Sequence, residues 1–166
     1  MPIAIAVDIG TSGIRAQALD MSSGAVISTA QTTSHPIPGA NVVDHLHFCL
    51  EAGVETGQRL MLEAVERLFR ALSVDRTDVA RLAVCGNPIQ LSIFEGRDVL
   101  DLANAQRAKV AESSYREGQI TNAKGSFGQL HLPSSCEVLI PPSVRHEVGA
   151  DALGMLIQSG VLELQG

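Results

Sequence analysis

Three apolar or alternating stretches at the start of the chain predict three strands joined by short turns. The first is the apolar run over residues 3–7, the second alternates apolar and polar positions over 14–19, and the third is the β-rich stretch 25–33. Alternation with a period of two is typical of a strand with one buried face. Residues 20–24 have the composition of a turn. The sequence therefore predicts an antiparallel three-strand meander.

A helical period follows the meander. Apolar residues recur at spacings of three and four over residues 54–72. These positions are Met61, Leu62, Val65, Leu68, Phe69 and Leu72. Either Asn41 or Asp44 can cap a helix before this stretch. Gly53 and Gly57 weaken helical propensity, so the sequence leaves open whether one helix runs through them.

The second half predicts alternating strands and helices. An apolar strand over residues 82–85 is followed by Asn87 and a proline, which suit the cap and first position of a helix over 89–94. A short strand over 138–140 and a final helix over 149–159 complete the pattern.

The order of these elements predicts the fold class. Residues 97–130 show no period, and their glycines suggest loops. The final helix has Leu153, Leu156 and Ile157 on its apolar side. A meander followed by strand–helix crossovers is an α/β layer architecture with a mixed sheet. We interpret this order as a ribonuclease-H-like lobe.

Composition narrows the possible partners and location. The chain has 166 residues, 45% of them hydrophobic and only 3% aromatic, so Val, Ile, Leu and Ala must build the core. A net charge of -6 without a basic run argues against nucleic-acid binding and against a polybasic membrane surface. No run of about 18 apolar residues or signal peptide is evident. We therefore expect a cytoplasmic location.

The cysteines and histidines do not form a recognisable metal motif. Cys49, Cys85 and Cys136 are far apart, so a disulfide framework or a cluster ligated within this chain is not expected. The apolar surroundings of Cys49 and Cys85 predict buried thiols. Four histidines are candidate metal ligands, but the preferred interpretation places them in pocket linings or on the surface: His35, His45, His47 and His146.

The turn between the first two predicted strands is the main candidate site. Gly10 and Gly13 allow backbone N–H groups to point into one concavity that suits phosphate oxygens. Thr11 and Ser12 add hydroxyl donors, and Asp8 at the strand end could hold magnesium through water. Neither the Rossmann nor the Walker motif is present. The alternative is an ordinary hairpin turn with a capping Asp.

Two other polar groups have both a structural and a functional interpretation. Asn87 offers an amide at the end of a strand, where ligands gather in α/β sheets, but it also suits a plain helix cap. Asp151 follows Gly149 in the first turn of the final predicted helix, where a carboxylate stabilises the helix dipole. It could instead orient a water near a phosphate.

The stretch from Asp8 to Gly13 resembles the first phosphate loop of the actin, sugar-kinase and heat-shock ATPase superfamily. Longer segments resemble successive blocks of the ATP-dependent reductive activators of corrinoid proteins, in the same order over nearly the whole chain. These segments are DIGTSGIRAQALD, HPIPGANVVDHLHF, RLAVCGNPIQLSIF and IPPSVRHEVGADALGMLI.

The resemblance implies a function and roles for these residues. The family couples ATP hydrolysis to reduction of cob(II)amide to cob(I)amide in corrinoid proteins of methyltransferase systems, with electrons passing through iron–sulfur clusters elsewhere in the protein. By resemblance, Asp8 organises magnesium, and Asp151 orients the attacking water. The nucleotide-binding set would be Gly10, Thr11, Ser12, Gly13, Asn87 and Gly149.

The chain also departs from the family pattern. The second phosphate loop, an Asp-x-Gly-Thr-Asn stretch, is not found, nor are the adenosine-binding half and the cysteine-rich region. Residues 1–166 would thus be the first lobe of the ATPase, and we expect this chain alone not to hydrolyse ATP at a useful rate. The alternatives are a sugar or acetate kinase of the same superfold and a non-catalytic module that binds a partner protein.

Overall fold

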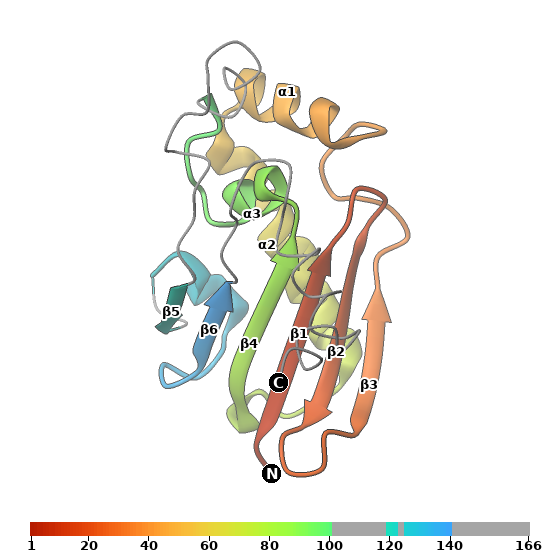
Figure 1. Cartoon of the computed structure of the whole chain (residues 1–166), viewed down its shortest axis with the longest axis vertical. Helices are drawn as coiled ribbons and strands as arrows, with labels where there is room; N and C mark the ends of the chain where they lie inside the picture. Colours follow the sequence, from red (N-terminus) through yellow and green to blue (C-terminus); the bar gives the residue numbers. More distant parts are fainter. Residues whose placement is uncertain (101–118, 123–124, 141–166) are drawn as a thin grey trace, which may run out of the picture.

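The computed structural model of this chain describes residues 1–100, 119–122 and 125–140. Within these ranges lies a six-stranded sheet in the order β3-β2-β1-β4-β6-β5 (Figure 1). The strands are β1 (Ile3–Ile9), β2 (Ile14–Asp20), β3 (Val26–Gln31), β4 (Val79–Gly86), β5 (Gln119–Asn122) and β6 (Glu137–Ile140). The helices are α1 (Val42–Ala52), α2 (Val54–Leu72) and α3 (Pro88–Phe94), with 3₁₀ turns η1 (Arg76–Asp78) and η3 (Gly125–Leu130).

The strand directions confirm the expected mixed sheet. β1, β2 and β3 form an antiparallel meander, whereas β4 pairs parallel to β1 and β6 pairs parallel to β4. β5 was not expected, because residues 97–130 were interpreted as loops. It is a four-residue strand of sequence QITN that pairs antiparallel to β6. So short a polar segment shows no hydrophobic period, and only its partner strand defines it.

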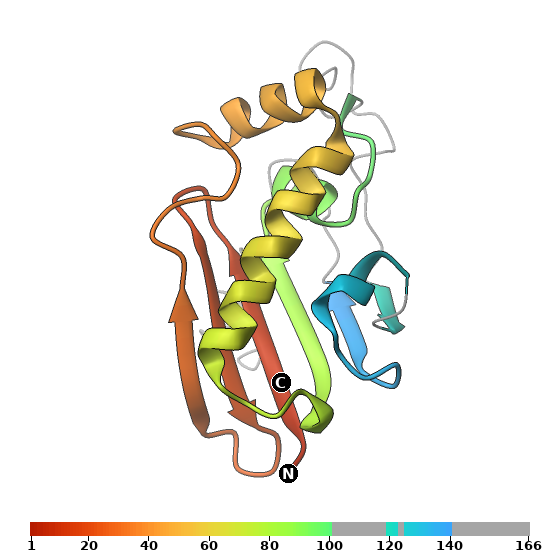
Figure 2. The same cartoon turned by 180° about the vertical axis from the view of Figure 1, so that it is seen from behind.

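Helix α2 covers one face of the sheet (Figure 2). Alternate strand residues are buried toward this helix, and they are Ile3, Ile5, Val7, Ile9, Ile14, Ala16, Ala18, Leu82 and Val84. The residues between them, such as Ala6 and Arg15, are exposed on the other face. This period of two is what the sequence showed. None of the helices in the described ranges combines the length and hydropathy that a membrane span requires.

Gly53 separates α1 from α2 and resolves the open question about the long helix. Its φ of 90° lies in a region that favours glycine. Asn41 is the cap of α1, since its side chain accepts hydrogen bonds from the backbone N–H groups of Val43 and Asp44 at 2.9 and 3.0 Å. Gly57 lies inside α2, where a side chain would collide with the sulfur of Cys49. That glycine therefore lets the two helices pack closely.

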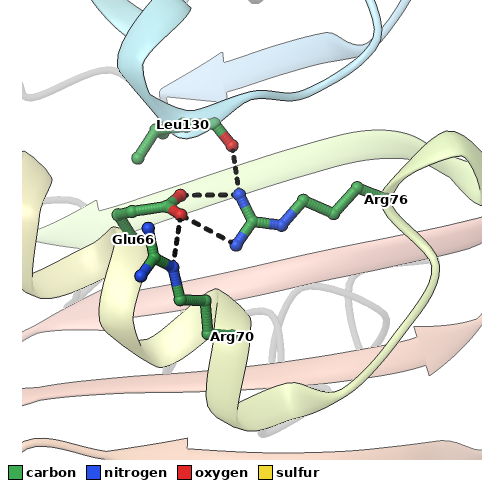
Figure 3. A network of polar contacts seen from close by, with 4 residues as sticks. All are labelled: Glu66, Arg70, Arg76 and Leu130. Atoms are coloured by element: carbon green, nitrogen blue, oxygen red, sulfur yellow. Dashed lines mark hydrogen bonds and ion pairs between the residues drawn. The ribbon is translucent and has the colours of Figure 1, made fainter.

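A half-buried ion-pair network attaches α2 to η1, which precedes β4, and to η3 (Figure 3). The Arg76 guanidinium donates to Glu66 at 2.6 and 3.1 Å and to the Leu130 carbonyl at 2.9 Å. Arg70 donates to the same carboxylate at 3.0 Å. Burial opposes the charge of Glu66, but the two arginines outweigh it and lower its pKa. The network thus ties α2 to η1 and η3.

We expect Arg76→Met to lower the free energy of unfolding by about 2 kcal/mol, because it leaves Glu66 with one partner and Leu130 without its donor. Urea unfolding measures this loss. Arg59→Met is the matched control, since Arg59 pairs with Glu63 on the exposed side of the same helix and should cost about 0.5 kcal/mol or less. Equal losses for the two variants would contradict the role of the network.

A second polar cluster joins α1, α3 and the segment after β3. The His35 and His45 rings stack with centroids 3.8 Å apart. His35 Nε2 donates to Gln90 Oε1 at 3.1 Å, and Gln90 Nε2 donates to His45 Nδ1 at 2.8 Å. His45 and Gln90 are fully buried. Burial, with the neighbouring His45, lowers the pKa of His35 to about 4, and burial also lowers the pKa of His45. Both rings are therefore neutral near neutral pH.

This cluster predicts a loss of stability in mild acid. The unfolded chain binds protons on these histidines near pH 6.5, whereas folded His35 does so only near pH 4, so stability falls as pH drops through that window. Denaturant unfolding between about pH 7 and about pH 4.5 measures the slope. His35→Gln should flatten it, and His47→Gln, at an exposed position of α1, should not. An unchanged slope in His35→Gln would contradict this prediction.

Candidate functional site

The carboxyl ends of β1, β4 and β6 lie at the same edge of the sheet, because these strands run parallel (Figure 1). Asp8 is directly opposite Cys85, and Ile9 is opposite Gly86. A side chain at Gly86 would place its Cβ only 2.9 Å from the Ile9 carbonyl oxygen. Glycine at this position therefore lets the two strand ends approach at the edge where the candidate residues lie.

The turn between β1 and β2 leaves its hydroxyl residues exposed. The Gly10 N–H donates to the Gly13 carbonyl at 3.0 Å, which closes the turn, and Thr11 and Ser12 face solvent. A Cβ at Gly13 would lie 2.8 Å from the hydroxyl oxygen of Thr32. Neither Gly10 nor Gly13 has a positive φ. Gly13 is thus needed for the close approach to Thr32 and not for a left-handed backbone conformation.

Segment 32–37 contacts the strand that follows this turn. The Thr32 hydroxyl accepts a hydrogen bond from the Ile14 N–H at 2.9 Å, and the Thr32 N–H donates to the Ile14 carbonyl at 2.9 Å. His35, three residues later, is hydrogen-bonded to Gln90 on α3. The same segment therefore connects the end of the turn, through Thr32, with the buried histidine cluster, through His35.

Asp8 is exposed on the face of the sheet that α2 does not cover. The Cys85 thiol lies 3.8 Å from its carboxylate as a weak donor. Arg15 is its direct partner on β2, but no ion pair joins the two within the described ranges. The three side chains line an open hollow of about 420 Å³ next to the turn. The hollow thus combines a carboxylate with a cation.

Sequence reasoning missed Arg15 as a functional residue. It treated the position only as the polar half of an alternating strand. The signal was available in the hairpin itself: a turn closed between Gly10 and Gly13 pairs Ile9 with Ile14 and therefore Asp8 with Arg15. Cys85 was also misjudged, since it was expected to be buried and is half-buried. It faces away from α2, whereas the neighbouring Val84 faces toward it.

Asn87 acts as a helix cap in this structure. Its side-chain oxygen accepts a hydrogen bond from the Gln90 N–H at 3.0 Å, and Pro88 follows it at the first helical position. The structural interpretation of this residue is confirmed, and its expected place in a nucleotide cleft stays a prediction. Gly149 and Asp151 lie outside the described residues.

The donor set is suited to hydrated magnesium and not to an iron–sulfur cluster. Magnesium keeps several waters and usually takes one or two protein carboxylates together with substrate phosphates, which the exposed Asp8 can supply. Among the described residues, no group of three or more His, Cys, Asp or Glu side chains is arranged to hold a metal ion. Cys49 and Cys136 are buried and separate thiols, so the cysteines do not fit a cluster.

Comparison with known proteins assigns the family. Residues 3–163 match the family described as the RACo middle region. The chain is 40% identical over 162 residues to the Co(II) methylated amine-specific corrinoid protein reductase of Methanosarcina barkeri. This match covers 95% of the present chain and 30% of that relative. A solved structure of a reductive activator for a corrinoid, iron–sulfur protein superposes with a TM-score of 0.78 at 20% identity, over 96% of this chain and 26% of the other.

The structural likeness confirms the mixed α/β fold, and the first two matches confirm the resemblance seen in the sequence segments. The chain belongs to the RACo middle region family.

Proposed function

We propose that this chain supplies half of the ATP and magnesium site of a reductive activator that reduces the cob(II)amide of a corrinoid protein to cob(I)amide. The relative from Methanosarcina barkeri is named as a reductase of such a protein. This chain spans about a third of that relative's length, so the activity of the whole protein is part of the proposal. A corrinoid protein of a methyltransferase system is the proposed partner, and the cytoplasm is the proposed location.

The pairing of Asp8 with Arg15 beside the exposed turn is the observation that carries the proposal. An exposed carboxylate at a strand end contributes little to folding. In the proposed site, Asp8 orients hydrated magnesium, which neutralises phosphate charge when bound. Arg15 and the hydroxyls of Thr11 and Ser12 bind phosphate oxygens. Hydrolysis of ATP requires mainly such positioning and charge stabilisation, without a covalent nucleophile.

The remaining roles extend the proposal beyond the described residues. We assign the orientation of the attacking water to Asp151 and nucleotide contacts to Asn87 and Gly149. In this proposal residues 1–166 form the first lobe of the ATPase, and the second lobe and the iron–sulfur region belong to other parts of the complete protein. Because the two lobes close around the nucleotide, one lobe alone should bind ATP weakly.

Two other functions are less well supported. A sugar or acetate kinase is less well supported, because the matching family and the relative from Methanosarcina barkeri favour corrinoid reduction. A module that only binds a partner protein would not need an exposed carboxylate, cation and hydroxyl pair around one turn. Magnesium-dependent nucleotide binding by the complete protein separates the proposed ATPase from that module.

We expect Asp8→Ala, made in the complete protein, to slow ATP-driven corrinoid reduction by about 10²- to 10³-fold. The thermal midpoint should change little, because Asp8 is exposed. Absorbance of the cobalt centre follows reduction, and a melting curve follows folding. Asp78→Ala, at an exposed position remote from the turn, is the control. Reduction near the wild-type rate in Asp8→Ala would refute the phosphate-site interpretation.

We expect Arg15→Gln to weaken binding of magnesium–ATP by about tenfold, because it removes a charge-assisted contact to phosphate. Titration calorimetry on the complete protein measures the dissociation constant. Arg67→Gln is the matched control, since Arg67 is exposed on α2 at the opposite face of the sheet. A dissociation constant unchanged by Arg15→Gln would remove this residue from the site and leave the role of Asp8 to its own test.

A further inference from the structure

Gln90 is a buried polar residue to which the proposed ATP site assigns no role. It lies on α3, which begins directly after β4 (Figure 1), and its side chain is fully buried. A buried amide costs free energy unless its donor and acceptor groups are hydrogen-bonded, and an apolar side chain at the same place avoids that cost. The polar contacts of Gln90 therefore indicate a role beyond filling the core.

The hydrogen bonds around the Gln90 amide all run in one direction. The Ile37 N–H donates to His35 Nδ1 at 3.1 Å, so the neutral ring carries its proton on Nε2. That Nε2–H donates to Gln90 Oε1 at 3.1 Å. The amide NH₂ group therefore faces His45 on α1 and donates to its Nδ1 at 2.8 Å. One backbone N–H thus defines the orientation of the whole amide, which is anchored on both sides. Fully bonded buried networks of this kind make a local arrangement rigid.

The backbone of Gln90 is bound by Asn87 at the same time. Asn87 Oδ1 accepts a hydrogen bond from the Gln90 N–H at 3.0 Å. This contact fixes the direction of the half-buried Asn87 side chain at the end of β4. Gln90 therefore orients Asn87 with its backbone, while its side chain binds the two histidines.

Gln90 also lies against the point where β1 and β4 leave the sheet. Ile9 and Gly86 are direct partners there. A Cβ at Gly86 would lie 2.9 Å from the Ile9 carbonyl oxygen and 3.7 Å from the Cβ of Gln90. The residues that follow these partners are Gly10, which begins the turn between β1 and β2, and Asn87. Gln90 is thus next to both strand ends that carry candidate nucleotide contacts.

The segment after β3 connects the Gln90 amide with the other end of the turn between β1 and β2. Thr32 and Ile14, the first residue after this turn, exchange two hydrogen bonds, each of 2.9 Å. His35 follows Thr32 by three residues and is bound to Gln90. A displacement of His35 would therefore move Thr32, and with it the residue that closes the turn.

We infer that Gln90 is a positioning residue that fixes the turn between β1 and β2 relative to Asn87. It acts on the turn through His35 and on Asn87 through its backbone N–H. The inference deepens the proposed function and rests on it, because the turn and Asn87 are proposed nucleotide contacts. Such positioning matters for catalysis, since a misplacement of about 1 Å can cost about 10²-fold in rate.

Gln90→Leu tests the inference without changing a proposed nucleotide contact. Leucine fills a similar volume but leaves His35 and His45 without the amide between them. We expect the dissociation constant of magnesium–ATP in the complete protein to rise about tenfold, measured by titration calorimetry. Gln58→Leu is the matched control, because Gln58 Nε2 donates to the Phe94 carbonyl at 3.2 Å at the opposite end of α3. This control should leave the dissociation constant unchanged, and equal effects of the two variants would overturn the inference.

His35→Phe tests whether Gln90 acts through His35. Phenylalanine keeps a ring that can stack on His45 but removes the hydrogen bond to Gln90. We expect it to weaken magnesium–ATP binding by a factor similar to that of Gln90→Leu, and the double variant to be little weaker than either, because both substitutions break the same connection. Fully additive effects on binding would show that the two residues act independently, which would overturn the inference.

Amide hydrogen exchange separates this inference from the proposed function, because it needs no ATP. In Gln90→Leu we expect the N–H groups of Ile14 and Thr32 to exchange about tenfold faster than in the wild type, and in Gln58→Leu to exchange as in the wild type. Peptide mass spectrometry of the complete protein follows both, with the amides of β4 as the reference for global unfolding. Unchanged exchange at Ile14 and Thr32 in Gln90→Leu would overturn the inference whatever the ATP titrations give. Faster exchange there, with no magnesium–ATP binding by the wild type, would refute the proposed function and support the connection from Gln90 to the turn.

Discussion

The parallel pairing of β1 with β4 is the constraint on which the rest of the structure depends. It places Asp8 beside Cys85 and Ile9 beside Gly86, and at Gly86 the two strands are so close that a Cβ would lie 2.9 Å from a carbonyl oxygen. Because β2 returns antiparallel on the other side of β1, Arg15 comes next to Asp8. The candidate site is therefore a result of strand register, and no long loop is needed to assemble it.

Two acidic residues, Glu66 and Asp8, have different roles because one is buried in an ion-pair network and the other is exposed. Glu66 is buried and has two arginine partners: Arg70 on α2 itself, and Arg76 on η1, which ties α2 to η1. Removing a partner leaves an unsatisfied buried group, so the charge of Glu66 serves to stabilise the fold. Asp8 is exposed, and among the described residues its carboxylate has the Cys85 thiol as a weak donor and forms no ion pair with the neighbouring Arg15. Replacement of Asp8 should cost little in folding, and its charge is free to act on a ligand.

The sequence predicted the elements whose period is strong. An apolar run identified β1, alternation identified β2, and the spacing of Met61, Val65 and Leu68 identified α2. Residue type also predicted Asn87 as a cap, and it left the cap of α1 open between Asn41 and Asp44, of which the structure has Asn41. It could not predict β5, whose four residues are mostly polar and show no period, or the reason for Gly13, which depends on Thr32 much later in the chain. The neighbourhood of Asp8 and Arg15 needed the pairing of two strands, which single-strand patterns do not contain.

The two faces of the sheet also differ in what they require. The face under α2 is filled by Ile, Leu and Val side chains, as a packed core demands. The other face has alanines at its centre and polar residues near the turn. One strand, β1, serves both faces: Val7 is buried under α2, and Asp8, the next residue, lies in the hollow on the other face. Packing of Val7 in the core thus fixes the backbone that positions Asp8.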